Sequence, residues 1–274
     1  MSEIYDKIYD IKDEFKHILN INYCDSNIKK YIKYKNYKGD KNGKYDIDCD
    51  SSKYATEIYR KKWTFLNGVK KATKQYKKID KNRYYIREYK YQLILNKNNK
   101  KEYYRGDTMT SFTNIFKHYE KNFLNDNEIH DLIEILAALY HCIGNMIPVP
   151  SGFNINRSGN RGIHDYWDIT MLKVKDWYDS GKKDDKILLD LLHSNKEAFY
   201  TCREWLLNNF DSWRCFVDKN YLRSFVDEEY NVIIFWKQHS WENYKLPKER
   251  DEFKRFLKLL IKCISNRYTE IVEM

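Results

Sequence analysis

Residues His141 to Asp168 read HCIGNMIPVPSGFNINRSGNRGIHDYWD and form the central stretch of this sequence. It holds two of the three prolines and four of the nine glycines of a 274-residue chain. Proline fixes its own φ and glycine tolerates positive φ, so both residue types interrupt helices. The sequence therefore predicts one ordered, tightly turned segment within a chain that otherwise favours helix.

On both sides of this stretch, apolar residues recur at helical spacing. The expected helices cover 2–20, 25–37, 51–76, 110–123, 128–142, 165–178, 184–192, 196–210, 213–225 and 249–272. Residues 83–95 and 101–105 alternate and are rich in β-formers, which predicts a hairpin with its turn at 96–99. Residues 230–236 fit a short strand or a buried helical turn. The predicted class is mainly α (α+β), a helical domain with a small β-hairpin and one long ordered loop in the centre.

Composition favours a single globular domain over residues 1–274. Its expected parts are a basic N-terminal part (1–105), a motif-bearing core (106–180) and a helical C-terminal part (181–274). With 42% hydrophobic and 16% aromatic residues, the chain can bury a large core. It has no apolar run long enough to span a bilayer, no signal peptide at its start and no CxxC pair among its six cysteines. We therefore expect a cytoplasmic protein that does not contact a membrane, and its oligomeric state stays open.

Positive charge is concentrated in one segment. Residues 53–105 contain 17 Lys and Arg but four Asp and Glu, an excess of 13, whereas the whole chain has a net charge of +10. A concentrated positive field attracts phosphate-rich partners. The pattern favours nucleic acid or another polyanion as the partner, and a solvated lysine-rich surface is the alternative. Lys70 and Lys74 are candidate contacts.

The central stretch also carries groups that could form a site. Arg157 and Arg161 lie beside glycines and could bind phosphate or carboxylate, and His141 and His164 flank them with titratable rings. Further candidates for the anion or nucleic-acid site are Arg105, Asn145, Asn154 and Asn156. If the stretch folds back on residues 105–112, these groups form a polar site; otherwise it is a rigid crossover.

Two resemblances rest on these motifs. The first series consists of Gly106-Asp107-Thr108-Met109, Ile143 to Pro150, Phe153-Asn154, Arg157 and Asp165 to Asp168. It resembles a family of uncharacterised bacterial proteins. The second is Ile143 to Ile147 with Phe153-Asn154 and Ser158-Gly159-Asn160. It is similar to part of the HNH-type nuclease domain of modification-dependent restriction endonucleases.

That nuclease resemblance implies a divalent-metal site in which an upstream His-Ile-x-Pro histidine is the general base. The corresponding region here, 105–112, has Asp107 but no histidine. The implied roles are Asp107 and His141 as metal ligands, His141 or His164 as base, and Mg²⁺ or Mn²⁺ as cofactor.

The leading hypothesis is a nucleic-acid-directed, nuclease-like protein of bacterial conflict with phage or mobile elements. One alternative is a non-catalytic interaction or inhibitor protein that binds an acidic protein partner. Another is a nucleotide- or anion-sensing domain.

Overall fold

The computed structural model describes residues 53–66, 70–71, 77–80, 83–85, 93–97, 100–110, 112–140, 142–150, 152–158 and 165–273. The expected helices at 2–20 and 25–37 lie outside these residues. The helices are α3 (Lys53–Lys62), η3 (Thr64–Leu66), α4 (Phe112–Asn122), α5 (Asn127–Leu139), η4 (Ile143–Asn145), α6 (Phe153–Ser158), α7 (Trp167–Asp179), α8 (Asp185–Leu191), α9 (Lys196–Asn209), α10 (Trp213–Lys219), η5 (Arg223–Phe225) and α11 (Arg250–Glu273). The strands are β1 (Lys70–Lys71), β2 (Lys77–Asp80), β3 (Arg83–Tyr85), β4 (Leu93–Lys97), β5 (Lys100–Thr108) and β6 (Met146–Pro150).

The predicted mainly α (α+β) class is confirmed, with a larger sheet than expected. The hairpin exists as β4 and β5, but β5 also pairs with β6, giving a four-stranded antiparallel sheet in the order β1-β4-β5-β6. A separate two-stranded sheet joins β2 to β3. Register places Asp107 opposite Ile147 and Gly106 opposite Pro148. The first half of the central stretch is thus a strand alongside the GDTM segment.

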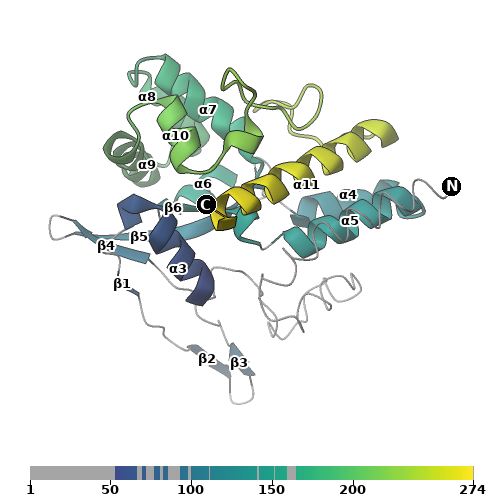
Figure 1. The fold of residues 1–274 in the computed structure, drawn as a ribbon, viewed down its shortest axis with the longest axis horizontal. Coiled ribbons are helices and arrows are strands. Elements are labelled where there is room, and N and C mark those ends of the chain that lie inside the picture. Colours follow the sequence, from purple (N-terminus) through teal and green to yellow (C-terminus); the bar gives the residue numbers. More distant parts are fainter. Residues whose placement is uncertain are drawn as a thin grey trace.

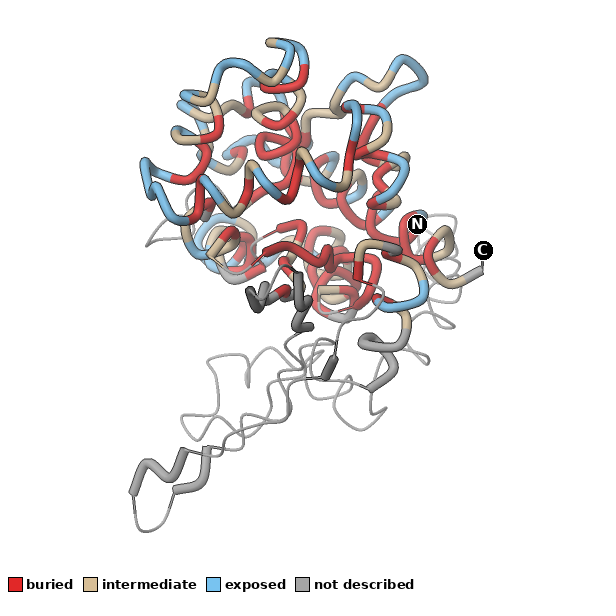
Figure 2. Tube along the Cα trace, turned by 90° about the vertical axis from the view of Figure 1, so that its left-hand side faces the viewer, coloured by how far each residue is buried: buried red, intermediate tan, exposed pale blue. Residues whose placement is uncertain are grey.

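The helices form two groups around the sheet (Figure 1). In this view α7, α8 and α10 lie above the strands, while α11 runs across the molecule beside α4 and α5. Buried residues concentrate in the interior of the described part of the chain (Figure 2), and all five residues of β6 are buried. No helix in the described part of the chain is long and apolar enough to cross a membrane.

Several sequence expectations were wrong in part. The helix expected over 213–225 ends at Lys219 and is followed by η5, and residues 83–85 pair with β2 instead of joining the hairpin. The helix expected over 51–76 ends at Lys62 and gives way to η3, because Trp63 and Phe65 pack against different partners. The Trp63 indole donates to Asn220 Oδ1 at 3.1 Å, whereas Phe65 contacts Tyr104 of β5. Residues 230–236 form neither a strand nor a helix, and only an isolated bridge pairs Val226 with Val232. The central loop contains η4, β6 and α6.

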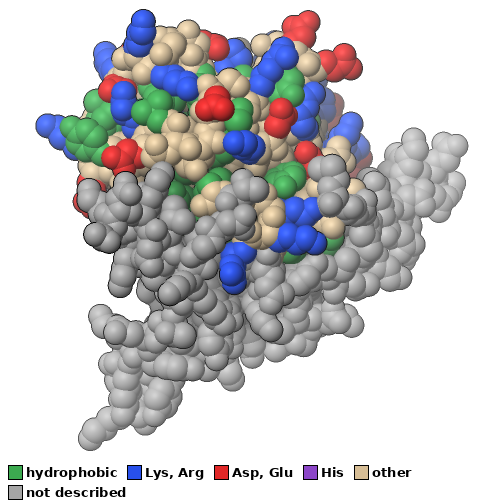
Figure 3. Space-filling view, turned by 60° about the vertical axis from the view of Figure 1, so that its left-hand side comes forward, with side chains coloured by type: hydrophobic (Ala, Val, Ile, Leu, Met, Phe, Trp, Pro, Cys, Tyr) green, Lys and Arg blue, Asp and Glu red, His purple; other side chains and the backbone are tan. Residues whose placement is uncertain are grey.

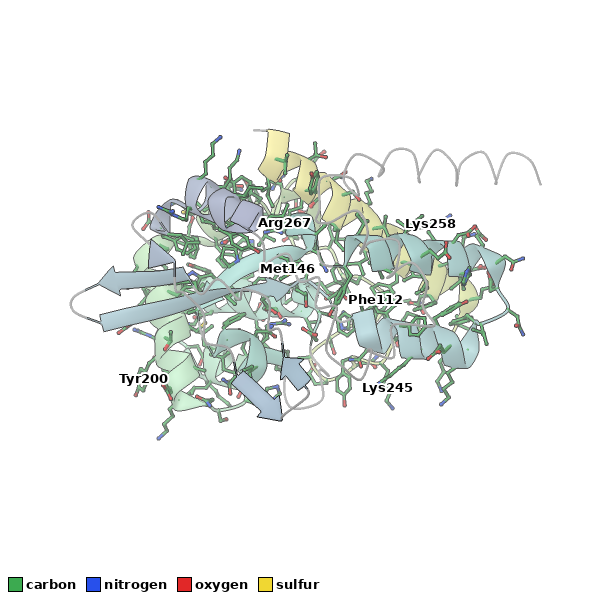
Figure 4. All side chains as sticks on the ribbon, turned by 90° about the horizontal axis from the view of Figure 1, so that it is seen from below. Phe112, Met146, Tyr200, Lys245, Lys258 and Arg267 are labelled. Atoms are coloured by element: carbon green, nitrogen blue, oxygen red, sulfur yellow. The ribbon has the colours of Figure 1, made fainter. Side chains whose placement is uncertain are left out.

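Close packing of η4 against α11 holds the central stretch in place. A Cβ added to Gly144 would lie 2.4 Å from the carbonyl oxygen of Ile264, so only glycine allows this approach. Arg267 of α11 is fully buried and donates to the carbonyls of Gly144 and Met146, both at 2.8 Å (Figure 4). These hydrogen bonds satisfy carbonyls where the helical part of the stretch ends and β6 begins.

Candidate functional site

The motif residues meet in a buried ion pair between β5 and α6. Asp107 and Arg157 both have fully buried side chains. The Arg157 Nε donates to Asp107 Oδ2 and Nη2 donates to Oδ1, each at 3.1 Å. This two-pronged contact matches the planar guanidinium to both carboxylate oxygens. The pair connects the GDTM strand to the helix that follows β6.

The start of α7 completes this cluster. Arg157 Nη2 also donates to Asp165 Oδ1 at 2.8 Å, and Nη1 donates to Thr170 Oγ1 at 3.2 Å. The Trp167 indole donates to Asp107 Oδ2 at 3.1 Å. Asp165 is the member closest to solvent, with its side chain 17% exposed. Three chain segments that are separate in the sequence, β5, α6 and the start of α7, therefore meet at one guanidinium. We call these five residues, 107, 157, 165, 167 and 170, the arginine cluster.

Burial and neighbouring charges shift the pKa values of Asp107 and Arg157 in the arginine cluster. Burial raises the pKa of Asp107 from 3.8 to about 7; Arg157 opposes this rise, Asp165 adds to it, and the Trp167 hydrogen bond opposes it. Burial alone lowers the pKa of Arg157, but Asp107 and Asp165 together raise it above its ordinary value. The guanidinium is therefore permanently charged, whereas Asp107 has a pKa near neutrality.

The asparagine candidates take local structural positions. Asn145 is fully buried and donates to the Tyr140 carbonyl at 2.5 Å, while its Oδ1 has no hydrogen-bond partner in the described part of the chain. Asn156 donates to the Gly152 carbonyl at 2.6 Å within α6, on which half-buried Asn154 also lies. The asparagines therefore support the turns around β6 and α6.

The remaining candidates are not brought into the arginine cluster by any described contact. Arg105 lies on β5, opposite Val149, and Lys70 lies on β1, opposite Ile94. The candidates outside the described residues are His141, His164, Arg161 and Lys74. Their proposed catalytic, metal-binding and anion-binding roles stay predictions. Among the described residues, no group of three or more His, Cys, Asp and Glu side chains is arranged to hold a metal ion.

A second buried pair is formed by Asp168, the residue after Trp167 in α7, and His239. The sequence does not predict this pair. Asp168 Oδ2 lies 2.6 Å from His239 Nδ1 and accepts the Phe235 backbone N–H at 2.9 Å. The His239 ring stacks on Trp236 with centroids 3.5 Å apart. His239 lies in an irregular segment 71 residues from Asp168. The sequence signal is Asp168 itself. A carboxylate beside aromatic residues of the core needs a polar partner.

Two buried atoms of the pair, Asp168 Oδ1 and His239 Nε2, have no hydrogen-bond partner among the described residues. Its described bonds join α7 to the segment between η5 and α11. Asp168 therefore anchors this irregular segment through one backbone and one side-chain contact.

Comparison with known proteins gives one match. The model of a family of unknown function, DUF6994, matches residues 29–271, in agreement with the expected membership of an uncharacterised family. No curated protein matches the chain, and no solved structure matches it. The resemblance to HNH-type nucleases stays a prediction. Because the match extends over nearly the whole length, the chain belongs to the DUF6994 family of unknown function.

Proposed function

We propose that this protein binds nucleic acid through a basic face built from residues 53–105. The observation that carries the proposal is the excess of 13 positive charges in this segment. Several of its described elements lie together: β1, β4 and β5 are neighbouring strands, and Phe65 of η3 contacts Tyr104 of β5 with ring centroids 5.7 Å apart. Figure 1 shows α3 beside these strands. Part of the basic segment is thus gathered in space, and a concentrated positive field attracts phosphate.

The exposed end of α3 supplies cations that are available to a partner. Arg60 and Lys61 are exposed, and no ion pair joins either of them to another residue in the described part of the chain. Lys62 beside them is half-buried, and its carbonyl accepts the Tyr221 hydroxyl at 3.2 Å. In the view of Figure 3, Lys and Arg side chains are spread over the described surface, and some of them lie at its lower edge.

The test is a salt titration of binding. Fluorescence anisotropy with labelled single- and double-stranded DNA and RNA is measured over a range of salt concentrations. Each phosphate contact contributes about 0.9 to the slope of log K against log salt for duplex DNA. If Arg60 and Lys61 each neutralise one phosphate, the double variant R60Q/K61Q loses about 1.8 from that slope.

The matched control is K183Q/K186Q, which removes two exposed lysines outside the basic segment. This control should leave the slope unchanged. If none of the probes shows salt-dependent binding, the proposal is wrong. Capture of one acidic protein in fixed ratio, free of nucleic acid, would favour the interaction-protein alternative. Binding of free nucleotides that is lost in the double variant would favour the sensor alternative.

Cleavage of nucleic acid and a role in conflict with phage or mobile elements are the finer part of the proposal. Asp107 is the described candidate for catalysis, and both of its oxygens accept hydrogen bonds from Arg157. Metal-dependent cleavage through Asp107 would therefore require release of this carboxylate. Incubation of the nucleic-acid probes with Mg²⁺ or Mn²⁺ tests the activity directly.

A further inference from the structure

Three carboxylate oxygens converge on one nitrogen of the arginine cluster. Arg157 Nη2 lies 3.1 Å from Asp107 Oδ1, 2.9 Å from Asp107 Oδ2 and 2.8 Å from Asp165 Oδ1. Two carboxylates around one point is the arrangement that hard cations select, since Mg²⁺ and Mn²⁺ prefer oxygen ligands. Here a guanidinium nitrogen occupies that point.

The residues present do not fit a divalent metal at the same time as Arg157. An oxygen-bound Mg²⁺ needs its ligands at about 2.1 Å, which is closer than any of these three oxygens comes to Nη2. Both Asp107 oxygens are engaged by Arg157, and Oδ2 also accepts from the Trp167 indole. A metal that entered would lie beside a buried positive charge, which is strongly unfavourable.

We propose that the Arg157 guanidinium is the resident cation of this site and takes the place of a divalent metal ion. The wild-type core then needs no metal, and the same carboxylates become a metal site only when the guanidinium is removed. This goes beyond nucleic-acid binding and does not depend on it. It opposes the metal-ligand role that the nuclease resemblance implies for Asp107.

Loss of the guanidinium creates a defined vacancy. In R157A, two carboxylates face each other in a space that the side chain has left, and Asp165 provides access from solvent because it is 17% exposed. When both carboxyl groups are ionised they repel each other, and a bound cation stabilises this ionised form against protonation of Asp107. Mn²⁺ is the probe, since it accepts oxygen ligands and reports its own binding by electron paramagnetic resonance.

The experiment measures Tm by differential scanning fluorimetry, with EDTA and then with excess Mn²⁺, in the absence of nucleic acid. The wild type should show no difference. R157A should melt lower in EDTA and gain about 5–10 °C at Mn²⁺ concentrations near one hundred times its Kd. R157A/D107N lacks one carboxylate and should lose that gain.

Two controls separate cation loss from general destabilisation. R157K keeps a positive charge and should show no Mn²⁺ effect. W167F removes one hydrogen bond to Asp107 but keeps Arg157, so it should be destabilised without responding to Mn²⁺.

Three results would overturn the proposal. The first is Mn²⁺ bound to the wild type and lost in D107N, measured by equilibrium dialysis and electron paramagnetic resonance. The second is a folded R157A protein whose Tm is the same with EDTA and with excess Mn²⁺. The third is an R157A protein that stays unfolded in excess Mn²⁺, because the proposal requires that a cation restores the site.

Discussion

Replacement of Arg267 by methionine should weaken the attachment of the central stretch to α11. Arg267 is fully buried and donates to four backbone carbonyls: those of Ile143 at 3.3 Å, Gly144 and Met146 at 2.8 Å, and Asn220 at 3.1 Å. Methionine has a similar length but no donor, so R267M leaves these carbonyls without this partner.

The magnitude follows from the carbonyls that lose a charged donor. Hydrogen bonds to charged groups contribute about 1.5–3 kcal/mol each, and relief from burying the guanidinium offsets much of their sum. We expect R267M to lower the free energy of unfolding by about 3 kcal/mol. R267K keeps the charge but cannot reach both Asn220 and the η4 carbonyls, so its loss should be about half as large.

Urea unfolding followed by circular dichroism measures these differences. The matched control is K262M, which removes an exposed cation from the same helix and should change stability by less than about 0.5 kcal/mol. A loss in R267M no larger than that of K262M would show that the Arg267 hydrogen bonds do not stabilise the fold. So would an R267K protein as stable as the wild type.

Two further outcomes concern the buried pairs. The pKa of Asp107 is raised to about 7, so this carboxyl contributes stability that is fully present below about pH 4 and is lost as pH rises through 7. The stability of the wild type relative to D107N should fall between pH 5 and pH 7.5 in urea unfolding, and a constant difference would contradict this. H239A leaves the Asp168 carboxylate buried with the Phe235 N–H as its described donor. It should cost about 3 kcal/mol and speed limited proteolysis between residues 226 and 249; an unchanged cleavage rate would exclude the anchoring role of this pair.

Helices with a clear apolar periodicity could be predicted from the sequence. The expected helices at 128–142 and 249–272 appear as α5 and α11 with ends shifted by up to three residues. Their inner faces pack against each other, so the periodicity reflects a real interface. The helix expected over 51–76 failed because its aromatic residues satisfied a helical pattern while packing against separate elements.

The residues of the candidate site could be predicted from the sequence, but the contacts between them could not. The motifs include both Asp107 and Arg157, but they predict separate roles for them, as a metal ligand and as an anion binder. Their pairing across 50 residues depends on β6 lying beside β5, which returns the chain to the GDTM segment. A strand containing two prolines does not suggest a sheet position, so the sequence predicts a loop here.

The positions of those prolines determine how the sheet ends. Met109 donates to the Asn145 carbonyl at 2.9 Å, and in the antiparallel register this makes 147 and 149 the residues that face β5 with their hydrogen-bonding groups. Pro148 and Pro150 therefore lie at the alternate positions, whose backbone nitrogens point away from β5, and neither can donate. A sheet edge without donors cannot recruit another strand. The prolines thus end the sheet at β6, and because all five residues of β6 are buried, other parts of the chain cover this edge.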